Sequence, residues 1–310
     1  MRAALKLAWT AVFVASSLAL LKAQDLSPRA YVITALRSNA VTLTYSYFSG
    51  SVLFNGVAPI TGATGTYSVP AFTYYHSFGM FGRSSNLNLA IPYGIGTFQG
   101  EVGDVTRQIY RSGLLDTTLR LSVNLRGGPA MQAREFAKWN QKTLLGASLK
   151  VVVPTGQYDP NKLINWGGNR WAFKPEFGYS RRRGHVLIDA YAGVWFYTTN
   201  QRYFSPIGPQ PQAEKPIGSF EGHLSYDFKP RFWVSLDGNF WFGGITSLSG
   251  IENLATRQTS SRIGGTASLP LGKHQSVKVS YANGTYVRFG GNYQTVSAAW
   301  QYSWVGRHLR

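Results

Sequence analysis

One segment in which apolar and polar residues alternate carries a histidine, a serine and an aspartate two positions apart, namely His223, Ser225 and Asp227. A serine next to a histidine base can act as a nucleophile, and outer-membrane phospholipases carry such a pair on one strand, with the nucleophile at the lipid face. Here Leu224 and Tyr226 occupy the apolar face of the segment, which turns His223 and Ser225 to the opposite face. The register therefore argues against lipid hydrolysis, and we expect no enzyme activity.

The other candidate ligands are too widely spaced for a metal site. No two histidines follow the H-x3-H or H-E-x-x-H spacing that places both rings on one ion. Asp159 and Asn161 could contribute to a calcium loop, but acidic residues are sparse around them and a turn explains the pair better. We expect no metal and no cofactor.

Charged side chains occupy the polar face of several alternating segments, and two interpretations of them stay open. They could line a passage that favours anions such as aromatic carboxylates, or they could pair across neighbouring strands and fill the interior. Interior aromatic residues are equally ambiguous, because they could stack on an aromatic solute or simply fill space. The candidate lining residues are Asp116, Arg120, Lys150, Arg170, Lys174, Glu176, Asp189, Trp195, Asp237 and Arg262.

The segments that position these residues alternate strictly. In 113–126, Leu119, Leu121 and Val123 interleave with Arg120 and Ser122, so a strand here would have one apolar and one polar face. About a dozen such segments follow one another, with few helices to cover their apolar faces. The candidate strands are 40–54, 66–79, 86–97, 113–126, 143–154, 169–180, 185–198, 217–228, 231–243, 259–270, 276–287 and 292–304.

The connections between these twelve candidates alternate in length. Long ones rich in Gly, Pro and Asn are 55–65, 98–112, 155–168, 199–216 and 244–258, and tight turns separate most of the remaining pairs. The link 127–142, which could hold a brief helix, is long where a short turn is expected, and the link near 290–291 is short where a long one is expected. Long loops at one end and short turns at the other are typical of bacterial outer-membrane barrels.

The N-terminus has the layout of a secretory signal. Arg2 and Lys6 precede an apolar stretch from Leu7 to Leu21, so we predict a signal peptide over 1–23 and a single barrel domain over 24–310. The alternative is an uncleaved helical anchor, for which the apolar run is short. No apolar run after Leu21 approaches the length of a spanning helix, so a membrane form of the mature chain must be a closed barrel.

The chain has no cysteine and a formal net charge of +18. The lack of cysteine excludes disulfides and a lipid-modified cysteine at the mature start. A strongly basic chain can bind nucleic acid, but the charges on the polar strand faces nearly balance, and the surplus lies at the short-turn end. We therefore expect no nucleic-acid partner. The surplus includes Arg83, Lys138, Lys142, Arg181, Arg182, Arg183, Lys229 and Lys273.

Several stretches resemble a known bacterial family. They are Leu119–Leu125, Arg134–Phe136, the distinctive PTGQYDPNKLIN of 154–165, Asn169–Glu176, Val194–Tyr197 and Ala299–Trp304. Together they are similar to the family of the MetA pathway of phenol degradation. The resemblance implies an outer-membrane β-barrel and, from the family's name, uptake of small compounds, aromatic ones among them. Family members commonly stop at the aromatic residue that closes the last strand, whereas here residues 305–310 follow Trp304.

The combined prediction is an all-β, closed antiparallel transmembrane barrel of about twelve strands in the bacterial outer membrane. Its expected role is a passive channel or facilitator for small organic solutes, with the loops 155–168 and 199–216 supplying any gate or plug. Expected partners are outer-membrane lipid, the solute and the outer-membrane insertion machinery. The alternatives are a non-conducting structural or adhesive barrel, and a secreted soluble β-protein that binds a hydrophobic ligand.

Overall fold

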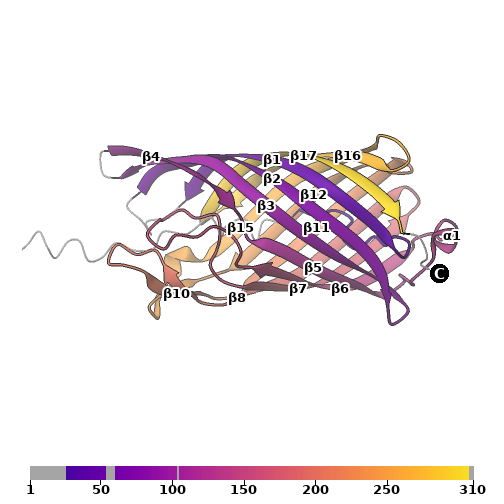
Figure 1. The fold of residues 1–310 in the computed structure, drawn as a ribbon, viewed down its shortest axis with the longest axis horizontal. Coiled ribbons are helices and arrows are strands. Elements are labelled where there is room, and N and C mark those ends of the chain that lie inside the picture. Colours follow the sequence, from indigo (N-terminus) through magenta and orange to yellow (C-terminus); the bar gives the residue numbers. More distant parts are fainter. Residues whose placement is uncertain (1–25, 54–59, 103–104, 307–310) are drawn as a thin grey trace, which may run out of the picture.

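Strands of the chain close into a single barrel (Figure 1). The computed structural model describes residues 26–53, 60–102 and 105–306. The predicted signal peptide, 1–23, and the last four residues lie outside this part of the chain. No helix in the described part is long and apolar enough to cross a membrane.

The wall of the barrel is built from thirteen strands of the described chain. Its strands are β1 (Ser38–Leu53), β2 (Ile60–Met80), β3 (Arg83–Val102), β4 (Val105–Leu114), β5 (Thr117–Arg126), β6 (Thr143–Val153), β7 (Ala172–Arg183), β8 (Val186–Tyr197), β11 (Ile217–Lys229), β12 (Phe232–Gly243), β15 (Gln258–Pro270), β16 (Gln275–Val287) and β17 (Gly290–Val305). A second, four-stranded sheet consists of β9 (Asn200–Tyr203), β10 (Gln210–Glu214), β13 (Thr246–Leu248) and β14 (Ile251–Asn253). The helical turns are α1 (Ala133–Phe136) and η2 (Leu254–Thr256).

Antiparallel pairing runs around the whole circumference. β1 pairs with β17 on one side and β2 on the other, and β2 continues the ring to β3. β3 pairs with β4 along its outer half and with β5 along its inner half, so β4 and β5 share one position in the wall. The described wall therefore has twelve strand positions, and the predicted twelve-stranded antiparallel barrel is confirmed.

The prediction of a loop over 98–112 was wrong. Most of this segment belongs to the hairpin of β3 and β4, which extends the wall beyond the other strands, as the upper left of Figure 1 shows. Residues 60–65, predicted as part of a loop, likewise belong to β2. Strands beyond the membrane need no apolar face, and Thr106, Arg107 and Gln108 of β4 are all exposed. The alternation that reveals a lipid-facing strand is therefore absent from β4.

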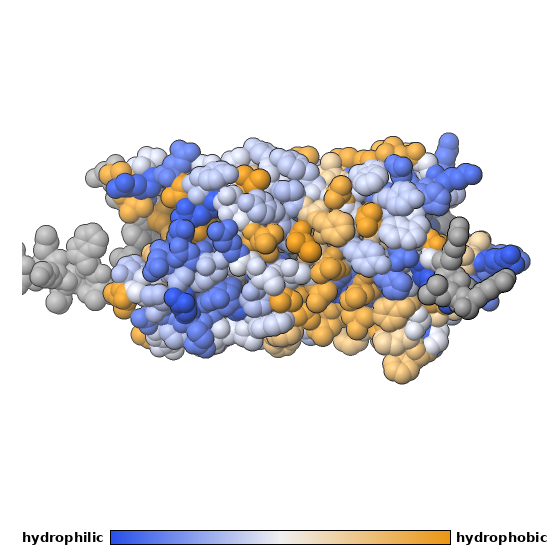
Figure 2. Space-filling model, in the orientation of Figure 1, coloured by the Kyte–Doolittle hydropathy of each residue, from blue (hydrophilic) through white to orange (hydrophobic). Residues whose placement is uncertain are grey.

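The two faces of the strands match the predicted alternation. On β11, Leu224 and Tyr226 are exposed on the outside, whereas His223 and Ser225 are buried. Strands that contact lipid expose their apolar residues, because hydrocarbon replaces the protein core as their cover. Figure 2 shows hydrophobic residues gathered over the right-hand half of one face, and a mostly hydrophilic surface toward the long-loop end.

Short turns gather at one end of the barrel and long connections at the other. The short-turn end, which faces the periplasm in outer-membrane barrels, also holds the link 127–142 with α1. The four-stranded sheet of β9, β10, β13 and β14 lies at the long-loop end. Its strands belong to the connection from β8 to β11 and to the connection from β12 to β15. The predicted difference between the two ends is thus present, including the long link at 127–142.

Candidate functional site: the barrel lumen

The segment 26–37, which precedes β1, lies inside the barrel. The backbone N–H groups of Arg29 and Ala30 donate to Asp189 on β8 (3.3 Å) and to the hydroxyl of Tyr191 on β8 (3.0 Å). The Arg29 guanidinium also pairs with Asp227 of β11 at 2.8 Å and lies over the Trp233 ring. The segment therefore obstructs the short-turn half of the lumen, and we call it the N-terminal plug.

Tyr31 anchors the middle of the plug. Its hydroxyl lies 2.9 Å from Ser148 Oγ of β6 and donates to Glu176 Oε1 of β7 at 3.0 Å. Its ring lies against Gly146 and Gly178, which pair directly across β6 and β7. A β-carbon on either glycine would stand within 2.3 Å of a ring atom, so no other residue type fits beneath the ring. Burial and the nearby Glu176 charge raise the pKa of Tyr31 to about 12.

The plug ends against the link 127–142. Ile33 packs with Met131 of this link and Leu144 of β6, while Phe136 and Trp139 lie alongside. The N–H of Leu36 donates to the Met131 carbonyl at 2.8 Å. The unusual length of this link is explained by its position, because it forms the floor on which the plug rests.

Charged residues of four wall strands form a connected series inside the lumen, which we call the ionic chain. Arg120 of β5 pairs with Glu176 of β7 at 3.3 Å, and Lys174 of β7 pairs with Glu176 at 2.7 Å and with Glu221 of β11 at 3.0 Å. His223 of β11 lies 3.6 Å from Glu221 and 2.8 Å from Asp237 of β12, and Asp237 accepts a hydrogen bond from Thr266 of β15. Buried charges need such partners, so Arg120 and Lys174 contact carboxylates.

The other predicted residues lie at different heights in the barrel. Asp116 accepts hydrogen bonds from the backbone N–H groups of Gly156 and Gly168, and so holds the loop 154–171. Arg170, in that loop, pairs with Glu214 of β10. The amines of Lys150 and Lys174 each lie 5.7 Å from the Trp195 ring, which is buried.

A cluster of aromatic side chains lies in the long-loop half of the lumen. Tyr67, Phe98, Trp166 and Tyr293 are buried together, and Phe48 stacks on Tyr67 with ring centroids 4.6 Å apart. Trp166 comes from the loop 154–171 and packs edge-on against Tyr67 at 5.7 Å. We call these five residues the outer aromatic cluster.

Two cavities lie between these obstructions. The inner cavity, of about 470 Å³, is lined by Arg120, Lys150 and Lys278 of the wall and by Ser27, Arg29, Ala30, Val32 and Thr34 of the plug. The outer cavity, of about 320 Å³, extends from Leu26 of the plug to Phe48 of the outer aromatic cluster. The lumen therefore contains space for small molecules, interrupted by the plug.

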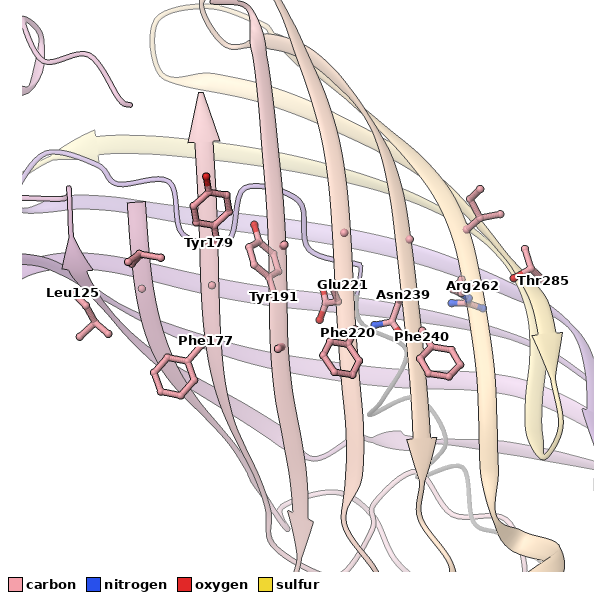
Figure 3. Close-up of a pocket in the computed structure, with 18 residues that line it drawn as sticks. Leu125, Phe177, Tyr179, Tyr191, Phe220, Glu221, Asn239, Phe240, Arg262 and Thr285 are labelled. Atoms are coloured by element: carbon pink, nitrogen blue, oxygen red, sulfur yellow. The ribbon is translucent and has the colours of Figure 1, made fainter. Parts of the chain in front are cut away.

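A third hollow lies on the outside of the wall. Figure 3 shows the rings of Phe177, Phe220 and Phe240, which come from β7, β11 and β12, along this hollow of about 900 Å³. All three rings are exposed, and no atom would contact a β-carbon placed on Gly222 between them. We assign the hollow to the lipid-facing surface.

Comparison with known proteins identifies the family. A model of the family described as "Putative MetA-pathway of phenol degradation" matches residues 35–298. The chain belongs to this family. The resemblance expected from the sequence is thereby confirmed. Among curated proteins, none matches the chain.

Solved structures of outer-membrane proteins share the fold. An outer membrane channel from Pseudomonas putida F1 is similar over 90% of this chain and 100% of that chain, with a TM-score of 0.74 and 16% identity. The β domain of the Bordetella autotransporter Brka is similar over 86% of this chain and 100% of its own, with a TM-score of 0.50 and 12% identity. The chain thus has the fold of an outer-membrane β-barrel.

Sequence reasoning missed the plug and the outer aromatic cluster. Residues 26–37 were left outside the predicted strands, and the gate was expected from the long loops alone. The structure instead blocks the inner half of the lumen with Tyr31 and Ile33 of the plug, while Trp166 of the predicted gate loop lies in the outer half. The only pattern in the plug that could have indicated a structured segment is the alternation of Tyr31, Ile33 and Ala35. This pattern is no longer than that of a weakly alternating strand.

Among the described residues, no group of three His, Asp or Glu side chains could hold a metal ion.

Proposed function

We propose that this barrel is a gated passive channel that carries small organic solutes across the outer membrane. The observation that supports it most directly is the pair of cavities, about 320 Å³ and about 470 Å³, that follow one another inside the barrel. Cavities of this size accept small ligands, and a passage needs weak sites in series to let a solute enter and leave. In this proposal the plug and the outer aromatic cluster are the two gates.

The lining of the outer cavity favours solutes with apolar surface. Phe48, Val69, Leu115 and Ala282 give it apolar walls, and the hydroxyls of Ser280 and Ser297 lie among them. Apolar walls with a few polar groups are typical of sites for small organic molecules. Aromatic solutes would also gain from contact with the outer aromatic cluster. An aromatic preference is part of the proposal.

A specific observation favours the alternative of a non-conducting barrel. The ionic chain fixes Arg120, Lys174 and Glu176 to one another and to Tyr31, as expected for a lumen filled for stability. If this filling never moves, the barrel has a structural or adhesive role.

Purified protein in liposomes separates the two functions. The channel proposal expects influx of monoaromatic solutes, such as benzyl alcohol and benzoate, that exceeds the influx into protein-free vesicles. A variant lacking residues 26–36 should raise this influx further, because the inner gate is removed. If the influx into vesicles with the full-length protein and into vesicles with the truncated protein equals the influx into empty vesicles, the non-conducting barrel is favoured.

Lipid and the insertion machinery complete the proposed partners. The exposed apolar side chains of the wall, such as Leu224 and Leu236, would contact lipid. Insertion would use the bacterial machinery for outer-membrane barrels, with β17 as the last strand. Trp304 lies at the end of β17, and the extension beyond Gly306 lies outside the described residues. Depletion of the insertion machinery should leave the protein unfolded in the periplasm, and a folded protein there would contradict this part of the proposal.

A further inference from the structure

Arg262 differs from the other buried cations of the lumen. Arg120, Arg170 and Lys174 each pair with a carboxylate. Arg262 is also buried, at 5% exposed, but within the described residues no acidic side chain pairs with it. Its Nη2 donates to the Tyr293 carbonyl at 2.6 Å, and its Nε is buried without a hydrogen-bond partner there. A buried guanidinium with an unused donor is costly unless a ligand satisfies it.

Arg262 lies on the wall of the outer cavity, which also contains a second unused polar group. The hydroxyl of Thr295, on β17, is buried and has no hydrogen-bond partner among the described residues. Both Arg262 and Thr295 line the same cavity of about 320 Å³. Two residues that each carry a buried donor without an acceptor in the described part of the chain thus line one cavity.

The acid in this cavity is already occupied. Asp237 lines the same space, but one of its oxygens lies 2.8 Å from His223 Nδ1 and the other accepts from Thr266 at 2.7 Å. Its charge is therefore engaged by the ionic chain and leaves Arg262 unpaired. The polar side of the cavity offers donors for an anion.

The rest of the cavity limits the anion to an organic one of small size. Phe48, Val69, Leu115 and Ala282 form its apolar part. A volume of about 320 Å³ is near the lower end of ligand sites, which span roughly 300–1,000 Å³. A planar carboxylate matches the fork of a guanidinium, and an attached ring or short chain matches the apolar part.

We propose that the outer cavity is a binding site for small amphipathic carboxylates, of which benzoate is the simplest aromatic example, with Arg262 and Thr295 holding the carboxylate. This inference deepens the proposed channel function, on which it rests for its biological meaning, by assigning the class of solute. The ring of the ligand lies against Phe48 and Leu115. Neutral aromatic molecules of the same size bind more weakly, because they leave the Arg262 donors unsatisfied.

Calorimetric titration of the detergent-solubilised protein tests the site. Benzoate is expected to bind more tightly than benzyl alcohol, which has the same ring and no charge. Arg262→Gln should weaken benzoate binding by about tenfold or more, the loss that a charged hydrogen bond implies, and leave benzyl alcohol binding unchanged. Thr295→Val, which keeps the shape of the side chain, should weaken benzoate binding by a smaller factor.

Two control variants separate a specific site from the general charge of the lumen. Lys278→Gln removes a cation of the inner cavity, and Lys273→Gln removes one from an exposed turn. Both should bind benzoate as the unmodified protein does. If Lys278→Gln weakens binding as much as Arg262→Gln, the diffuse field of the lumen attracts the anion and the site is refuted.

The inference and the proposed function can fail separately. Benzoate binding that depends on Arg262, together with no liposome influx, keeps the site and removes the channel. The channel stands and the site is refuted if influx occurs but benzoate binding is undetectable. The same holds if influx occurs and neither Arg262→Gln nor Thr295→Val changes the benzoate affinity. Heat-modifiable electrophoretic mobility checks that each variant is folded. If Arg262→Gln does not fold, the Thr295→Val comparison decides alone, and an unchanged benzoate affinity in that variant refutes the site.

Discussion

Gly178 of β7 lies so close beneath the Tyr31 ring that a β-carbon on Gly178 would stand 2.1 Å from Tyr31 Cε2. The wall and the plug are therefore fitted to each other at one point. Gly146, the partner of Gly178 in the register of β6 and β7, meets the same ring from the neighbouring strand. Any side chain at these positions must displace the plug or distort the wall.

Gly178→Ala should loosen the plug. The added methyl group overlaps the ring, so Tyr31 must leave its position over Gly146 and Gly178, which we call the niche. It then loses its hydrogen bonds to Ser148 and Glu176. We expect a single-channel conductance several times that of the unmodified protein in planar bilayers. Gly222→Ala is the matched control, because no atom lies within 4 Å of its added carbon. Equal conductance of the two variants would contradict the role of the niche.

Lys174→Met should lower the free energy of unfolding. The change leaves Glu176 and Glu221 buried without the cation between them, and removal of one partner from a buried pair costs about 3–5 kcal/mol. Urea titration of the folded barrel in lipid vesicles measures the loss. Lys162→Met, which breaks the exposed pair with Asp159, should leave the titration unchanged. A Lys174→Met midpoint equal to that of Lys162→Met would show that the ionic chain does not stabilise the fold.

Trp166→Ala should open the outer gate. Its ring packs against Tyr67 and Phe98 in the outer aromatic cluster, and its removal leaves a gap above the outer cavity. We expect faster influx of benzyl alcohol into liposomes at unchanged folding yield. Trp171→Ala, at an exposed tryptophan on the same connection, serves as the control. The proposed gate is wrong if the two variants give the same rate.

High pH should release the plug through Tyr31. The pKa of Tyr31 is raised from 10.0 to about 12, so the protonated phenol stabilises the folded plug fully below pH 10, and this stabilisation is lost as the pH rises through about 12. The phenolate that forms would face Glu176, which repels it. Conductance should therefore rise between about pH 10 and pH 12.

Tyr31→Phe isolates this effect from other titrating groups. The variant keeps the ring in its niche and has no phenol to ionise, so its conductance should be flat over the same interval. A rise of the same size in Tyr31→Phe would assign the titration to another group.

The sequence by itself determined which way each side chain of most wall strands points. Strict alternation fixes the face of a residue, because successive side chains on a strand point to opposite sides, and lipid requires the apolar one. Alternation places Leu224 on the apolar face, where it is exposed, and Lys174 and Asp237 on the polar face, where they are buried. The closed barrel followed as well, because exposed apolar strands without a spanning helix leave no other membrane structure.

Tertiary structure alone decided what each inward residue touches. Alternation does not say which residues of two non-adjacent strands lie at the same height in the barrel. The contact of Lys174 on β7 with Glu221 on β11 therefore depends on the tilt and closure of the barrel. The unpaired state of Arg262 follows from the same geometry, because Asp237 in the same cavity is taken by His223 and Thr266. The place of residues 26–37 could not be derived from a repeating pattern either, since the plug is held by individual contacts such as Tyr31 against Gly178.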